Sequence, residues 1–139
     1  MKNLIFTIAF TLVSITAFSQ KSEGVTVTIT VENVKNDKGK ASFALHTEDT
    51  FMKGAGVMNA ESVIKDGKVV ITFDNVEPGN YAVLALHDEN ENGRMDFQNN
   101  GMPLESYGVS NNNMSYGPPQ YSDAKFEVAD KPVALKIRF

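Results

Sequence analysis

The sequence has no cysteine, and it has only two histidines. The absence of cysteine excludes disulfide bonds and a lipid-modified cysteine, so the folded chain has to be stabilised by its core, with a bound metal as the one further aid. It also lacks any cluster of basic residues: 17 Asp and Glu stand against 13 Lys and Arg, for a net charge of −4. This balance argues against nucleic acid or an anionic membrane as a partner.

Sequence motifs of catalysis are missing as well. The chain contains no Gly-x-Ser-x-Gly sequence, no nucleophile next to a base and no phosphate-binding loop. The carboxylates of Asp88 and Asp96 could in principle do acid–base work, but nothing else in the sequence favours a hydrolase. We therefore expect a protein that is not an enzyme.

Residues 1–19 have the pattern of a secretory signal peptide. Lys2 gives a positive start, the stretch from Leu4 to Phe18 is largely apolar, and Ala17 and Ser19 stand at the spacing of a cleavage site. A membrane anchor is the alternative, but the apolar run is shorter than the roughly 20 residues that a spanning helix needs. We expect residues 20–139 to form one domain without a transmembrane segment, located in the periplasm or outside the cell.

The rest of the chain alternates between apolar and polar residues in short runs, which is typical of β-strands with one buried face. Turn residues separate the runs, and we expect two hairpins: 25–31 with 41–47, and 62–65 with 68–73 about Asp66-Gly67. Phe51 and Met52, between these hairpins, are expected to fold back onto the core. The pattern predicts an all-β fold, a single antiparallel β-sandwich of about seven strands with one long loop: 25–31, 41–47, 62–65, 68–73, 81–86, 124–128 and 133–139.

The long loop, from Asp88 to Tyr121, is rich in asparagine and in acidic residues. A connection of this length in a compact domain indicates function, disorder or an unrecognised element. It opens with Asp88-Glu89-Asn90-Glu91-Asn92-Gly93-Arg94-Met95-Asp96. Side-chain oxygens therefore stand at positions 1, 3, 5 and 9, with glycine at position 6, which is the front half of a calcium loop.

The front half of the loop offers fewer oxygen ligands than the six to eight that calcium takes. Asn99 stands at position 12, where such loops usually carry a bidentate glutamate, so we expect Glu105 or water to complete the shell. With few formal charges, binding should be weak and in the millimolar range. Two alternatives remain: a metal-free turn in which Asp and Asn cap their own backbone, and a different ion. The predicted ligands are Asp88, Asn90, Asn92, the carbonyl of Arg94, Asp96 and Glu105.

Two further sets of side chains have candidate roles. Tyr107, Tyr116 and Tyr121 lie near glycine and proline; they could line a groove for a glycan or a peptide, although we favour their pinning the loop to the sandwich. His46 and His87 each end a predicted strand. As neighbours across the sheet they could form a zinc or copper site with Asp88, although we favour packing and hydrogen bonding for His87.

Several of these motifs resemble a family of secreted bacterial proteins that is catalogued as domain of unknown function 2141. The resemblance rests on residues 78–83, 87–96 and 101–110, with support from Pro119 and residues 122–126; Ser106 stands where we would expect glycine. It implies a periplasmic or secreted β-sandwich of the transthyretin-like kind, and it implies no activity.

Together, the residues and the resemblance predict an exported, non-enzymatic binding or accessory module of the envelope with a weak calcium loop. An envelope protein or a glycan is the expected type of partner. The alternative is a glycan- or peptide-binding protein that uses the loop tyrosines and has a metal-free Asx-rich turn.

Overall fold

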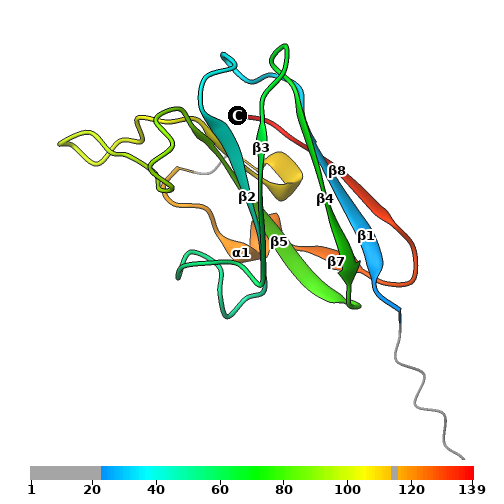
Figure 1. The fold of residues 1–139 in the computed structure, drawn as a ribbon. Helices are drawn as coiled ribbons and strands as arrows, with labels where there is room; N and C mark the ends of the chain where they lie inside the picture. Colours follow the sequence, from blue (N-terminus) through cyan, green and yellow to red (C-terminus); the bar gives the residue numbers. More distant parts are fainter. Residues whose placement is uncertain (1–22, 114–115) are drawn as a thin grey trace, which may run out of the picture.

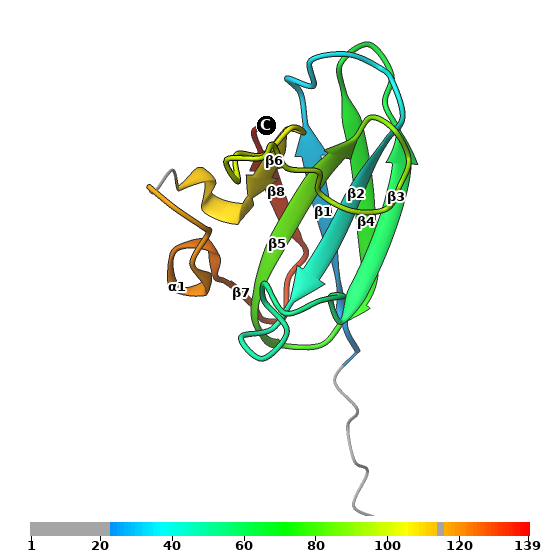
Figure 2. The same ribbon diagram turned by 90° about the vertical axis from the view of Figure 1, so that its left-hand side faces the viewer.

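The computed structural model describes residues 23–113 and 116–139, so the predicted signal peptide lies outside the described residues. These residues form two β-sheets packed face to face (Figures 1 and 2). The three-stranded sheet has the order β4-β1-β8, from strands β1 (Val25–Val31), β4 (Val69–Val76) and β8 (Val133–Ile137). The predicted all-β fold is confirmed.

The larger sheet holds the strand that leads into the candidate loop. Its order is β3-β2-β5-β6, and β7 pairs with the opposite end of β5. Two short helical segments follow β6. The elements of this half are β2 (Lys40–His46), β3 (Met58–Val63), β5 (Gly79–Asp88), β6 (Tyr107–Val109), the 3-10 helix η1 (Ser110–Asn112), α1 (Tyr121–Ala124) and β7 (Phe126–Val128).

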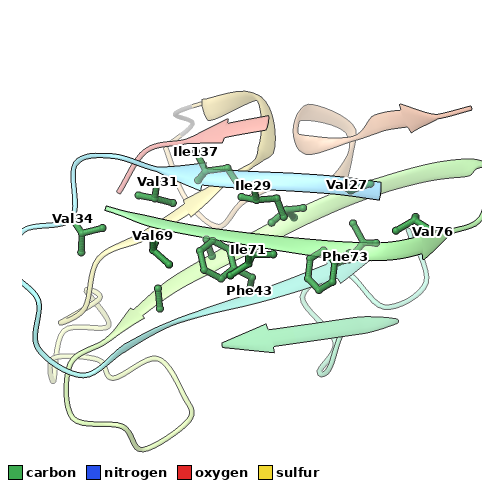
Figure 3. Close-up of a cluster of buried hydrophobic side chains, with 14 of the residues drawn as sticks. Val27, Ile29, Val31, Val34, Phe43, Val69, Ile71, Phe73, Val76 and Ile137 are labelled. Carbon is green, nitrogen blue, oxygen red and sulfur yellow. The ribbon is translucent and has the colours of Figure 1, made fainter. Parts of the chain in front are cut away.

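The main core fills the space between the two sheets (Figure 3). In β1 every second residue, Val27, Ile29 and Val31, is fully buried, and the threonines between them face outward. Val69, Ile71 and Phe73 of β4 follow the same alternation, as the pleat of a half-buried strand requires. Burying these side chains is the main favourable term in folding.

Strand pairing differs from the prediction. β1 and β2 lie in different sheets, so the expected hairpin between them is wrong: β1 pairs with β4 in antiparallel and with β8 in parallel. The sandwich is therefore not purely antiparallel. The physical reason is that alternation fixes which face of a strand is buried, and that face is equally buried whether the next strand lies beside it or across the core.

The predicted turn at Asp66-Gly67 is confirmed, but strand pairing next to it is limited to Lys65 with Lys68. Lys65 and Lys68 exchange two backbone hydrogen bonds of 2.9 and 3.0 Å, and Asp66 and Gly67 both have positive φ. Beyond this pair the chain separates, because β3 joins the five-stranded sheet and β4 joins the three-stranded one. The turn thus connects the edges of the two sheets.

A second, smaller cluster of buried residues holds the end of the long loop. Phe51, Ala82, Val109 and Ala124 form it, with Leu84 and Tyr121 packed against them. The prediction that Phe51 folds back is confirmed, whereas Met52 is 54% exposed and does not. The Ser110 hydroxyl joins β5 to α1 here: it accepts a hydrogen bond from the Val83 N–H and donates one to the Ala124 carbonyl.

The long loop is shorter than predicted, because it contains β6, η1 and the start of α1. Tyr107 faces Leu86 and Val109 faces Leu84 in the sheet. A strand of three residues is too short to show alternation, so the sequence did not reveal it. No helix among the described residues is long and apolar enough to span a membrane. Every described strand and both buried clusters lie after Gly24, so a chain that begins at Gln20 retains the whole described fold.

Candidate functional site

The site begins where β5 runs out of the core. Its last residue, Asp88, is only 3% exposed. The two oxygens of its carboxylate accept hydrogen bonds from the N–H groups of Asn92 (3.1 Å) and Gly93 (2.7 Å). Gly93 has φ +77, a conformation that glycine adopts at little cost. The loop therefore turns tightly around one buried carboxylate.

Two asparagine side chains of the loop meet at one carboxylate oxygen of a third residue, Asp96. The amide groups of Asn90 and Asn92 donate hydrogen bonds of 2.7 and 2.8 Å to Oδ2 of Asp96. Each asparagine also accepts one backbone N–H, Asn90 from Asn92 and Asn92 from Arg94. A rotation of either amide group would turn its oxygen, in place of its nitrogen, toward this point. The structure thus brings together three of the four side chains that the spacing singled out, whereas the hydrogen bonds of the fourth, Asp88, go to backbone N–H groups of the loop.

Glu105 returns to the same loop although it lies nine residues beyond Asp96. Its carboxylate accepts the N–H of Glu89 through Oε1 (3.0 Å) and the N–H of Asp96 through Oε2 (3.3 Å). The return is made by a hairpin, in which the Leu104 N–H donates to the Asp96 carbonyl at 2.8 Å. Glu105 is 9% exposed, so both ends of the loop are held by one buried carboxylate.

The charges of this site are poorly compensated. Among the described residues, neither Asp88 nor Glu105 forms an ion pair, and the partners of both carboxylates are backbone N–H groups. Arg94 lies 3.9 Å from Asp96 but is 78% exposed, and Lys40 reaches only the rim, 3.4 Å from Glu91. A buried carboxylate without a cation is costly, so the loop would be stabilised by a positive ion.

Such an ion would depend on neutral oxygens. No three His, Asp or Glu side chains in the described part of the chain lie close enough together to hold a metal by themselves. The amide oxygens of Asn90 and Asn92 and the carbonyl of Arg94 would have to supply the remaining ligands. Calcium accepts carboxylate, amide and carbonyl oxygens alike, whereas zinc and copper favour nitrogen and sulfur.

Gly39 lies against the backbone of Asp88 and Glu89 at the start of the loop, a contact that no sequence pattern indicates. It has φ +64, and a Cβ built on it would lie 2.0 Å from the Asp88 carbonyl oxygen. Gly39 lies in the bend just before β2, and it meets Asp88 because β2 and β5 are neighbours in the sheet. A side chain at position 39 would therefore displace the backbone at the start of the loop.

The predicted proximity of the two histidines is wrong. His87 faces Ala41 across the sheet and His46 faces Ala82, so the two histidines are offset by five residues, or about 17 Å of strand. His87 is fully buried, donates Nε2–H to the Lys38 carbonyl (2.8 Å) and stacks on Phe139. Burial lowers the pKa of His46, and the hydrogen bond to Thr50 opposes this shift. Together they do not form a metal site.

The three tyrosines do not form one surface. Tyr107 faces Leu86, whereas the Tyr121 hydroxyl donates to the Asn80 carbonyl (2.9 Å), about 20 Å away along β5. Tyr121 also packs edge-on against Phe51, and burial, followed by the charge of Glu48, raises its pKa. It pins α1 to the sheet. Tyr116 is fully exposed.

Comparison with known proteins identifies the family. A family model described as an uncharacterized protein conserved in bacteria (DUF2141) matches residues 29–136. The chain belongs to the DUF2141 family. The resemblance seen in the motifs is thereby confirmed, and the DUF2141 match contains the complete loop together with Gly39 and Glu105. No curated protein and no solved structure matches the chain.

Proposed function

We propose that this DUF2141 protein is an exported, non-enzymatic accessory module whose Asp88–Asp96 loop binds calcium weakly. The observation that carries the proposal is the pair of buried carboxylates, Asp88 and Glu105, which have no cationic partner among the described residues and lie at the two ends of a loop whose asparagine amide groups meet at Asp96. An exported protein meets calcium at millimolar concentrations, which is the range where loops of low charge bind it.

Each predicted ligand has a distinct part in this arrangement. Asp88 and Glu105 supply buried charge from opposite ends of the loop, and Asp96 supplies charge at the point where Asn90 and Asn92 meet. Bound calcium would neutralise these carboxylates and draw the amide oxygens inward. The loop would then be held by an ion in addition to the hydrogen bonds that its side chains make to its own backbone.

The burial of both histidines supports a non-enzymatic role. Both histidines in the described part of the chain are buried, and both ring systems already have a hydrogen-bonding partner. A general base has to reach the proton that it abstracts. We therefore expect the loop to order the structure and present a surface, and not to turn over a substrate.

Calorimetry and thermal unfolding of the chain from Gln20 test the proposal. At a calcium concentration tenfold above Kd, binding should add about 1.4 kcal/mol to the free energy of unfolding. Magnesium should add less, because it gives up its water reluctantly. If ~10 mM calcium gave no heat of binding and no rise in Tm, the proposed site would be refuted. An equal response to magnesium would show that calcium is not the specific ion.

Charge-matched variants locate the binding. Asp88→Asn and Asp96→Asn should abolish the calcium response, because each removes a carboxylate from the loop. Asp130→Asn is the control: it removes the same charge from an exposed position between β7 and β8 and should leave the response unchanged. Equal losses in all three variants would indicate non-specific screening.

Glycan or peptide binding by Tyr107 and Tyr116 is the second candidate function. The full exposure of Tyr116 and the 39% exposure of Tyr107 favour it. Soluble oligosaccharides or peptides should then change the tyrosine fluorescence, and a chelator should have no effect on this change. A Tyr116→Ala variant with an unaltered response would exclude the residue.

A further inference from the structure

The loop beyond Asp96 forms a projecting hairpin with an apolar tip. We define the tip as residues 97–104, and in Figure 1 this yellow-green part of the chain reaches away from both sheets. Phe97 and Pro103 are paired across the hairpin. Phe97, Met102 and Leu104 are each 59% exposed, which makes the tip a concentrated group of exposed large apolar side chains. Such side chains in a native protein indicate a contact surface.

The composition of the tip restricts what it can contact. Residues 97–104 read Phe-Gln-Asn-Asn-Gly-Met-Pro-Leu, with no charged side chain. The acidic residues of the calcium loop precede the tip, and Glu105 follows it at the buried base. The tip can therefore leave water without desolvating a charge, and no charge on it directs it toward a charged partner.

Phe97 and Pro103 form a bridged pair, and paired residues share a face of a hairpin. Met102 and Leu104 stand on either side of Pro103 in the sequence, and Leu104 lies in a bend. The polar turn Gln98-Asn99-Asn100-Gly101 closes the hairpin, with a hydrogen bond from the Gly101 N–H to the Gln98 carbonyl. The exposed apolar side chains therefore flank this turn.

The backbone of the tip is paired in part. The N–H groups of Gln98 and Gly101 donate to carbonyls within the hairpin, each at 2.8 Å. Leu104 donates to the Asp96 carbonyl, Met102 donates to the Asn100 side chain, and Pro103 has no N–H. Among the described residues the N–H groups of Phe97, Asn99 and Asn100 have no partner, so the tip suits the hydrated interfacial region of a bilayer and not its hydrocarbon centre.

We propose that this tip inserts into the interfacial region of a lipid bilayer, and does so through apolar contact and not through charge. Eight residues are far fewer than the 20–30 per side of a stable protein–protein interface, so a second copy of the chain would bury too little area on them. A bilayer needs no complementary shape, and its hydrated interfacial region can take up the polar turn together with the apolar side chains that flank it. The acidic loop behind the tip should favour zwitterionic over anionic lipid.

A tryptophan at the tip reports insertion directly, because the natural sequence contains none. Phe97→Trp, in the chain from Gln20, should show a blue-shifted emission when phosphatidylcholine vesicles are added. Val63→Trp is the control, since Val63 is 56% exposed but lies on β3; its emission should not shift. Equal shifts at the two positions, or no shift at Phe97→Trp, would refute the proposal.

Vesicle co-sedimentation measures the contribution of the tip. Phe97→Ser with Leu104→Ser should weaken the binding roughly tenfold or more, whereas Val63→Ser with Val70→Ser, which changes exposed valines elsewhere, should not. Binding that requires phosphatidylglycerol and disappears in salt would show electrostatic attachment and would contradict insertion. So would self-association in sedimentation velocity that the tip variant abolishes.

All of these measurements are made in EDTA. The inference about the tip therefore goes beyond the calcium proposal, and each can fail without the other. Because the substituted side chains are exposed, thermal unfolding should show that the variants fold as the natural chain does.

Discussion

The backbone N–H of Asp96 donates a hydrogen bond of 3.3 Å to the side chain of Glu105, whose other oxygen accepts the N–H of Glu89 at 3.0 Å. One buried carboxylate thus closes the loop at both of its ends. β5 (Gly79–Asp88) leads into this loop and the paired strand β6 (Tyr107–Val109) follows it, so the geometry of the loop is tied to that of the sheet.

Glu105→Gln should destabilise the protein by about 1–3 kcal/mol, because one of the two acceptors becomes an N–H₂ group that faces a backbone donor. Urea unfolding measures this change. Glu127→Gln, at an exposed position on β7, removes the same charge and should have little effect. If the two variants were equally stable, Glu105 would not be closing the loop.

Gly39→Ala should cost more stability than Gly101→Ala. Both glycines have positive φ, +64 and +80, so both substitutions strain the backbone by about 1–2 kcal/mol. Only at Gly39 does the new Cβ meet the Asp88 carbonyl, and we expect this to add a further 1–3 kcal/mol or so. Denaturant midpoints compare the two. Equal losses would mean that the close approach to Asp88 relaxes without cost.

Trypsin should cut the loop at one place. Arg94 is the only Lys or Arg between Asp88 and Tyr121, and it is 78% exposed. Since the Arg94 carbonyl is a proposed calcium ligand, ~10 mM calcium should slow cleavage after Arg94 and EDTA should restore it. Mass spectrometry of the fragments identifies the site. Cleavage elsewhere at an unchanged rate is the internal control, and an equal rate at Arg94 with and without calcium would count against the ion.

His46 should make the protein sensitive to mild acid. Burial lowers its pKa in the folded state, so the unfolded chain takes up a proton first as the pH falls through about 6.5. The contribution of neutral His46 to the free energy of unfolding is therefore complete above this pH. Below it, this contribution falls by at most about 1.4 kcal/mol per pH unit. His46→Gln should lose less stability than the natural chain between about pH 7 and pH 5. Parallel stability curves for the two proteins would exclude the effect.

The parts of the structure that could be predicted are those with local causes. The alternation of Val27, Ile29 and Val31 with threonine is visible in the sequence, and a strand with one buried face follows from it. The Asp66-Gly67 turn needs only two residues that tolerate positive φ. The contacts among Asn90, Asn92 and Asp96 span one turn of chain, so their spacing was sufficient to place them together.

The parts that could not be predicted depend on residues far apart in the chain. The parallel pairing of β1 with β8 joins positions more than 100 residues apart, and nothing in either strand specifies its neighbour. The exposure of Phe97, Met102 and Leu104 was equally hidden, because an apolar residue in a loop can turn inward or outward. The separation of His46 from His87 depends on the register of β2 and β5.

The sequence by itself determined that this is an all-β DUF2141 chain with an Asp/Asn loop at the end of an apolar strand. Tertiary structure alone decided that Gly39 lies against Asp88 and that Glu105 returns to close the loop. The reason is physical: turn geometry and alternation act between neighbours along the chain, whereas a carboxylate, a glycine and an apolar tip acquire their surroundings only when two sheets pack and bring distant segments together.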